Sequence, residues 1–224
     1  MKKQRNLTRF ENWTIDDLHV RLRVIPQQDG DADRELRQWL ATPLRSDAPA
    51  DLEVLRTYLA ENYLYWNEIE LISHFIIPVL DRVRFGNRYY RLFQEKNLRA
   101  KVQDYDVQGK VDGMVAFGVG EFPSQPYFFL HEYKRLKGTD ADPLGQLLIT
   151  MLAAQAENDI QRPIYGCFVI GVLWRFVVLA GNRYACSPTY EAVETEELHQ
   201  IYALLHYVKQ KVVEDIRKTY PDAD

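Results

Sequence analysis

Two charged residues follow directly on an apolar run near the middle of the chain. In the segment FFLHEYKRL (128–136), Glu132 and Lys134 come after Phe, Phe and Leu. Because side chains alternate along a strand, Glu132 and Lys134 are expected to project from the same face. A carboxylate and an ammonium at the end of a buried strand are costly unless they are paired or used. An ion pair at a strand end and a catalytic pair are both open readings of this segment.

The preceding strand-like segment, KVDGMVAF (110–117), carries an acid in equally apolar surroundings. Asp112 stands there among Val, Met, Ala and Phe, and the adjacent Gly113 is expected to leave room for a group to approach the backbone. A short connection joins the two segments, so we expect neighbouring strands on which Asp112 and Glu132 converge. Two carboxylates at one point suit Mg²⁺ or Mn²⁺. The alternative is that Asp112 is a turn residue that happens to precede a strand.

A third acid lies in WNEIELISHFIIPVLDRV (66–83), which has the apolar spacing of a helix. Glu68 lies four residues before Ile72 and eight before Ile76, which predicts that it faces the core. Glu70 shares the opposite face with polar residues and is the reserve candidate. The alternative for Glu68 is a partner for a core Arg or Lys. Pro78 predicts a kink or a break in this helix. The predicted core face consists of Ile69, Ile72, Ile76, Val79, Leu80 and Val83.

The order of these residues resembles the D…(D/E)-x-K signature of the PD-(D/E)XK nuclease superfamily. Asp112 is followed twenty residues later by Glu132-Tyr133-Lys134. The segment NEIELISHFIIPVL (67–80) is similar to the helix before that site in nuclease domains of type I restriction motor subunits and related uncharacterised bacterial proteins.

A further part of the resemblance lies in PLGQLLITMLAAQ (143–155). It looks like the helix after the signature lysine, on which a Gln often faces the site, and Gln146 occupies that position. In all, the resemblance spans roughly residues 65–181, about half of the chain.

The resemblance implies a restriction-endonuclease-like fold and a metal-dependent nuclease that hydrolyses phosphodiester bonds, with DNA favoured over RNA. In such a site Asp112, Glu132 and Glu68 ligate Mg²⁺ or Mn²⁺, the last directly or through water. Lys134 orients the attacking water or neutralises charge on phosphorus, and Gln146 positions water or phosphate. The alternative function is a catalytically silent module that binds nucleic acid or a protein partner in a defence or mobile-element system.

The elements that must position these residues follow the order αα-βββ-α-ββ-α, which predicts an α/β (α+β mixed) fold with a mixed central sheet flanked by helices. We expect an antiparallel meander, a helix with Asp142 as its N-cap, two further strands and a long C-terminal helix. These elements span residues 89–102, 109–118 and 125–136 for the meander, 142–159 for the helix, 164–180 for the strands and 194–220 for the last helix.

Residues 1–50 are expected to form an N-terminal strand-helix extension, and residues 51–224 the nuclease-like domain. Alternation of apolar and polar residues over 14–26 predicts a half-buried strand. A Pro-, Ala- and Asp-rich linker (42–51) precedes a helix that Asp51 is expected to cap.

Composition places few limits on function. The 224 residues suffice for one well-buried domain with extensions, and a net charge of −4 neither requires nor excludes nucleic acid. The two cysteines lack CxxC spacing and are expected to be free thiols in a reducing cytoplasm. No apolar leader or spanning helix is expected, so we predict a cytoplasmic protein without membrane contact. The helix at 194–220 could pack on the core or on a second copy, so a homodimer is left open.

Overall fold

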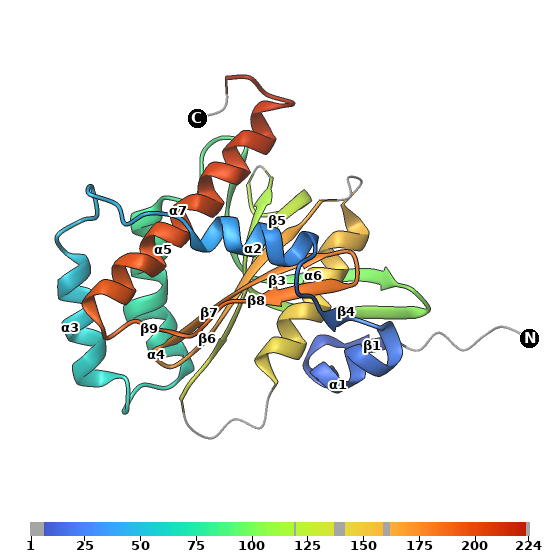
Figure 1. Ribbon diagram of the computed structural model, residues 1–224, viewed down its shortest axis with the longest axis horizontal. Helices are drawn as coiled ribbons and strands as arrows, with labels where there is room; N and C mark the ends of the chain where they lie inside the picture. Colours follow the sequence, from blue (N-terminus) through green and yellow to red (C-terminus); the bar gives the residue numbers. More distant parts are fainter. Residues whose placement is uncertain (1–6, 119, 137–141, 159–161, 223–224) are drawn as a thin grey trace, which may run out of the picture.

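In the part of the chain that the structure describes, a mixed nine-stranded sheet forms the centre of the molecule, and helices lie on both of its faces (Figure 1). The computed structural model describes residues 7–118, 120–136, 142–158 and 162–222. The strands follow the order β1-β4-β5-β6-β7-β8-β2, with β3 beside β4 and β9 beside β7. The expected α/β (α+β mixed) class is therefore confirmed.

The expected meander is also confirmed. Strands β3 (Tyr90–Val102), β4 (Tyr105–Phe117) and β5 (Ser124–Lys134) pair antiparallel in sequence order. Strand β4 begins four residues earlier than the sequence indicated, because the β3–β4 turn needs only two residues. Gln103, the first of them, adopts a left-handed conformation with φ 51°. The hairpin is consequently longer than expected and extends well past the candidate acids.

A parallel crossover joins the meander to the second half of the sheet. Helix α6 (Pro143–Glu157) connects β5 to the parallel strand β6 (Ile164–Ile170). Its expected N-cap is confirmed, since the Asp142 side chain accepts from the Gly145 N–H at 2.9 Å. The remaining elements are β7 (Leu173–Ala180), β8 (Arg183–Cys186), β9 (Tyr190–Glu191) and α7 (Thr195–Arg217).

The first fifty residues supply the strands at the two ends of the order β1-β4-β5-β6-β7-β8-β2. Strand β1 (Leu7–Arg9) pairs parallel with β4, and β2 (Ile25–Pro26) pairs parallel with β8. Helix α2 (Asp31–Leu40) packs on one face, where the Trp39 indole N–H donates to the Leu204 carbonyl at 2.8 Å. The segment expected as an extension is thus continuous with the core.

The predicted strand over residues 14–26 is wrong. Helix α1 (Ile15–Asp17) runs into a π-helical turn, Leu18–Leu22, and strand structure is confined to β2. A capping box between Thr14 and Asp17 starts the helix. Leu18 and Leu22 are buried at helical spacing, whereas Val20 between them is 81% exposed. The apolar residues at 18 and 22 fit the two-residue period of a strand as well as the turn of a helix. The Thr14–Asp17 capping box favours the helix.

The helix expected over 66–83 is divided at its centre. Helix α4 (Glu68–Leu71) passes through a π-helical turn, Ile72–Ile76, into α5 (Ile77–Val83), so the kink or break expected at Pro78 takes the form of a widened turn before it, and the helical backbone does not break. The widened turn changes the helical phase, and the predicted core position of Ile69 is wrong, since it is 77% exposed. The residues buried instead in its first half are Leu71 and Phe75.

Two apolar clusters lie on opposite faces of the sheet. One joins the strands to α2, α3 (Leu52–Asn62), α5 and α7, and the other joins them to α6 and the N-terminal helical turn. Both cysteines are free. In the described part of the chain, no helix has the length and apolar content needed to cross a bilayer.

Candidate active site

The two strand acids lie beside each other on neighbouring strands. Gly113 is paired with His131 in the β4–β5 ladder, so the next step of the same register brings Asp112 opposite Glu132. The backbone N–H of Tyr133 donates to Asp112 Oδ2 at 2.8 Å, which fixes this carboxylate against β5. The sequence therefore predicted correctly that Asp112 and Glu132 are neighbours.

Lys134 is held against the same pair of strands. Its Nζ donates to Glu132 Oε1 at 2.6 Å and to the Tyr133 carbonyl at 3.0 Å. The Lys134 and Glu132 side chains are only 15% and 9% exposed, so the ion pair is well shielded from water. Burial acts to lower the pKa of Lys134, but the nearby carboxylates, Glu132 above all, outweigh it and the pKa is raised.

One ammonium does not compensate for both acids. Burial, reinforced by the Asp112 charge, raises the pKa of Glu132 to about 8 in spite of Lys134. Burial also raises the pKa of Asp112, although the Tyr133 N–H and Lys134 act in the opposite direction. Both acids therefore favour the protonated form more than free carboxyl groups do, and a further cation would counteract this.

The acids open into a cavity of about 890 Å³. Buried Gln146, from the N-terminal part of α6, reaches the same cavity as Asp112, Glu132 and Lys134. Four of the five residues predicted for the site are therefore brought together. The other lining residues are Arg9, Phe10, Glu11, Asn97, Leu98, Arg99, Gln108, Gly109 and Lys110.

Glu68 stands apart from this group. It is the first residue of α4, is half-buried, and does not line the cavity. Its charge nevertheless contributes to the raised pKa of both Asp112 and Glu132. Within the residues that the structure describes, no three His, Cys, Asp or Glu side chains gather closely enough to hold a metal ion. Glu68 therefore acts on the site through its charge.

Glu70, the reserve candidate, has a structural role. Its carboxylate accepts from the Asn67 backbone N–H at 2.8 Å, and the Asn67 side chain accepts from the Glu70 N–H at 3.0 Å. This capping box starts α4 and so positions Glu68. The N-x-x-E spacing was visible in the sequence and would have explained Glu70.

The space beside Gly113 serves the opposite face of the sheet. A Cβ at this position would lie 3.1 Å from the Tyr133 hydroxyl and 3.4 Å from His131. These two buried side chains share a contact of 2.6 Å between His131 Nδ1 and Tyr133 Oη. Gly113 does leave room for a group to approach the backbone, as expected, and that group is the Tyr133 side chain of the protein itself.

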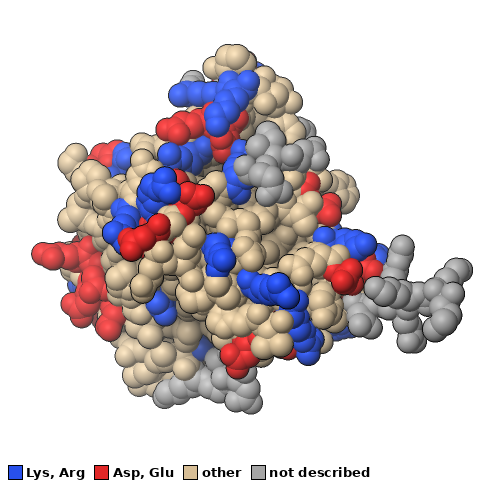
Figure 2. Space-filling view, turned by 45° about the vertical axis from the view of Figure 1, so that its right-hand side comes forward, with Lys and Arg blue, Asp and Glu red and all other residues tan. Residues whose placement is uncertain are grey.

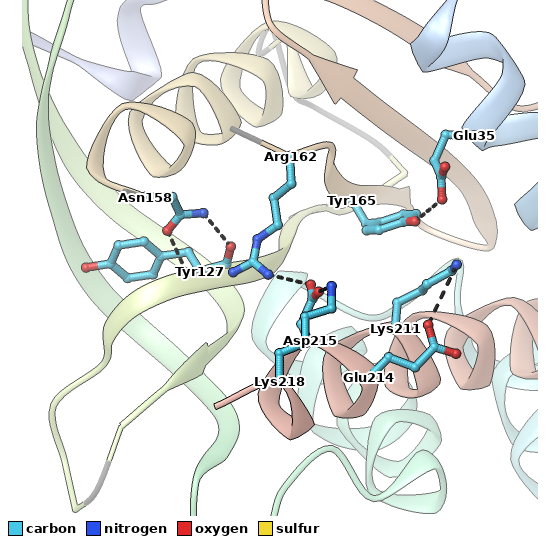
Figure 3. Close-up of polar contacts among 9 residues, drawn as sticks. All are labelled: Glu35, Tyr127, Asn158, Arg162, Tyr165, Lys211, Glu214, Asp215 and Lys218. Carbon is cyan, nitrogen blue, oxygen red and sulfur yellow. Dashed lines mark hydrogen bonds and ion pairs between the residues drawn. The ribbon is translucent and has the colours of Figure 1, made fainter. Parts of the chain in front are cut away.

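A clamp at the far end of the crossover holds α6 against β5 (Figure 3). The Asn158 side chain accepts from the Tyr127 N–H and donates to the Tyr127 carbonyl, both at 2.9 Å. Asn158 ends α6, whereas Gln146 lies near its beginning. The clamp therefore helps to fix the helix that presents Gln146 to the cavity.

Two basic groups in the sequence could hold phosphate or could simply be solvated: Arg82, Arg84, Arg88 and Arg91, and then Arg99, Lys101, Lys134, Arg135 and Lys137. Those that the structure describes fall in different places. Arg99 lines the cavity. Arg82 instead pairs with Asp51 at 2.5 Å. Asp51 makes no side-chain capping bond to α3, so its predicted capping role is wrong. Lys137 lies outside the described residues. Sequence reasoning missed Arg9, Asn97, Gln108 and Lys110, because only the strand pairing brings them to the cavity.

Comparison with known proteins gives a partial similarity. No family model matches the chain. Over 138 residues it is 29% identical to the cysteine–tRNA ligase of Nitratidesulfovibrio vulgaris strain Hildenborough, and equally to that of strain DP4. The match covers 58% of this chain and 27% of each ligase. The chain thus spans about a quarter of the length of these curated relatives.

Proposed function

We propose that this protein is a metal-dependent nuclease whose active centre is formed by Asp112, Glu132 and Lys134. The observation that carries the proposal is the pairing of one buried carboxylate, Glu132, and one half-buried carboxylate, Asp112, with one shielded ammonium at an open cavity. Strongly shifted pKa values in a cavity are typical of functional sites. The arrangement agrees with the resemblance to PD-(D/E)XK nucleases.

The residues present fit a hard divalent cation. The raised pKa values of Asp112 and Glu132 indicate a deficit of positive charge, which such a cation would supply. Mg²⁺ commonly binds through one or two carboxylates and completes its shell with water and substrate phosphate. Asp112 and Glu132 would hold the ion, and Glu68 would add negative charge near it from outside the cavity. When bound, Mg²⁺ or Mn²⁺ polarises a phosphate and lowers the pKa of a coordinated water.

The other side chains divide the remaining tasks. Lys134 provides fixed positive charge where a phosphoryl oxygen becomes more negative, or orients the attacking water through its ammonium. Its two hydrogen bonds hold it in place before substrate arrives. Gln146 can hydrogen-bond a water or a phosphate oxygen from the α6 side. No side-chain nucleophile is needed in this mechanism.

DNA is the proposed substrate, and RNA belongs in the same test. The partial relatives are ligases that act, by their name, on tRNA. Only a quarter of each ligase is matched, so this similarity adds tRNA to the substrates to be assayed without displacing DNA. The alternative function is a catalytically silent module that binds nucleic acid or a protein partner.

The test is cleavage of single-stranded, double-stranded and branched DNA, and of tRNA, with Mn²⁺ and with EDTA. Wild type and Lys101→Ala, an exposed β3 lysine outside the cavity, should both cut with Mn²⁺ only. Lys134→Ala should lose on the order of 10²- to 10³-fold in rate and still gain thermal stability from Mn²⁺.

Two outcomes contradict the proposal. Cleavage by Lys134→Ala at the wild-type rate would mean contamination or a different site. Binding of nucleic acid without cleavage by any variant would favour the silent module.

A further inference from the structure

Beyond the acids, the β3–β4 hairpin carries a row of polar residues across three strands. Gln108 on β4 is in register with Arg9 on β1 and with Arg99 on β3. Residues in register on adjacent strands project from the same face. Arg9, Gln108 and Arg99 therefore form one row, and all three line the candidate active-site cavity.

A second row lies one step closer to the acids. Lys110 is in register with Asn97 on β3, and both are exposed and line the cavity. The intervening residues Leu98 and Val111 are buried in the apolar cluster below the hairpin. The polar face of the hairpin therefore continues into the site.

The spacing of these rows matches a nucleic-acid backbone. Gln108, Lys110 and Asp112 are two residues apart along β4, and two residues of an antiparallel strand span roughly 6.8 Å. Successive phosphates of an extended nucleic-acid strand are separated by a comparable distance. A phosphate at Asp112 would thus place the next beside Lys110 and Asn97, and the one after it between Arg9 and Arg99.

The first row is held firmly although both of its arginine residues are exposed. Gly109 allows β1 to approach closely, because a Cβ there would lie 2.6 Å from the ring of buried Phe10. Phe10 follows Arg9 directly, and the buried Trp13 donates to Thr8 at 3.1 Å. These contacts fix the backbone that carries Arg9.

The basic groups are available to an incoming polyanion. Arg9 contacts Glu11 at 3.4 Å with both side chains more than 60% exposed, and Lys110 pairs with Glu95 under similar exposure. Exposed pairs of this kind contribute little and are readily exchanged. Arg99 forms no ion pair with any described residue. Basic and acidic side chains are interspersed on the face shown in Figure 2, so cationic character is local.

We propose that these two rows bind the sugar–phosphate backbone of the substrate strand over the two nucleotides next to the scissile phosphate. This inference rests on the proposed nuclease function and names the path of its substrate. The N-terminal segment therefore contributes to substrate binding through Arg9.

The first experiment measures binding in EDTA, where no cleavage occurs, by fluorescence anisotropy of a labelled single-stranded oligonucleotide across a salt series. Each neutralised phosphate of a single strand contributes ~0.7 to the slope of log K against log salt. Arg9→Gln/Arg99→Gln should lower that slope by roughly one to one and a half. Arg34→Gln/Arg88→Gln removes two exposed arginines outside the cavity and should leave the slope unchanged.

The second experiment uses oligonucleotides with one uncharged methylphosphonate at each position around the cut. Wild type should cut about tenfold more slowly when the neutral linkage lies two nucleotides from the cut on one side, the effect of losing about 1.4 kcal/mol. Arg9→Gln/Arg99→Gln should be insensitive to that linkage. Circular dichroism and the single variant Arg99→Gln, with half the slope change, exclude misfolding as the cause.

The outcomes separate the two proposals. If Arg9→Gln/Arg99→Gln lowers the salt slope but neither wild type nor any variant cleaves, the proposed backbone path is supported and the nuclease function is rejected. Cleavage with an unchanged slope in Arg9→Gln/Arg99→Gln would retain the nuclease and overturn the path.

Discussion

Two charged regions of this molecule use similar residues in opposite ways. In the candidate active site, Asp112 and Glu132 lie beside one shielded ammonium. In the second region, between β6 and α7, Asp215 accepts from Arg162 at 2.5 Å and from Lys218 at 2.7 Å (Figure 3). In the candidate active site two acids share one cation, whereas Asp215 by itself has two cations.

The difference supports the proposal that the first of these regions is the active site. The second region ties elements together, since Glu35 of α2 also accepts from the Tyr165 hydroxyl of β6, and the Arg162 guanidinium lies 4.8 Å from the Phe128 ring. Such contacts stabilise the packing. In the active-site region, burial and repulsion raise the pKa of Glu132 to about 8, which lowers stability at neutral pH. Sites that are costly to the fold in this way are typical of function.

The largest expected effect comes from Asp112→Asn. The amide can still accept the Tyr133 N–H, but it removes a proposed metal ligand and the repulsion on Glu132. We expect cleavage to fall on the order of 10³-fold and the metal-free protein to melt at a higher temperature than wild type. Calorimetry with and without Mn²⁺ checks the second part. A lower melting temperature would contradict the electrostatic account of this site.

A smaller effect is expected for Glu68→Gln. Glu68 acts on the two acids by charge from outside the cavity, and groups that act through ligands typically change activity by roughly 10- to 100-fold. The matched control is Glu70→Gln, because glutamine preserves the capping box while the same charge is lost two residues away. Cleavage rates should separate the two variants. Equal rates would mean that the Glu68 charge has no greater effect on Asp112 and Glu132 than the Glu70 charge, and would contradict this role.

Local sequence signals predicted part of the candidate site, whereas positions that depend on long-range pairing could not be predicted. Asp112, Glu132 and Lys134 were predictable because an acid in an apolar strand needs a reason, and alternation places Glu132 and Lys134 together. The Asp142 cap and the meander followed from local signals of the same kind. Arg9 was not predictable, because its place depends on long-range pairing of a three-residue strand.

Errors arose where two local signals competed. Over residues 14–26 the apolar alternation outweighed the Thr14–Asp17 capping box in our interpretation, although the helix forms. In 66–83 a single helical period was assumed, but the π-helical turn before Pro78 shifted the phase and exposed Ile69. The metal and the nuclease activity remain predictions.

A moderate effect is expected from pH. The folded pKa of Glu132, about 8, lies above its unfolded value near 4.5, so the folded state binds the extra proton between these values. Stability of the metal-free protein should therefore fall as pH rises from about 4.5 to about 8, and Asp112 contributes with the same sign. Melting curves from pH 5 to 9 in EDTA should show a decline that is shallower in Asp112→Asn. Mn²⁺ should restore stability most at pH 8. Identical slopes for the two proteins would assign the decline to other groups.

The smallest effect tests the second region by itself. Asp215→Asn leaves Arg162, whose side chain is 17% exposed, without its carboxylate partner. Because the pair is only partly shielded, we expect a loss of about 1–2 kcal/mol in the free energy of unfolding and a melting temperature lower by several degrees. Cleavage should remain at the wild-type rate, since Asp215 lies on α7, away from the cavity. Without metal, we expect the melting temperature to rise in Asp112→Asn and to fall in Asp215→Asn. This difference in direction distinguishes the proposed active site from a region that stabilises packing. If Asp215→Asn instead reduced cleavage without lowering stability, the second region would belong to the active site, and the division between the two would be wrong.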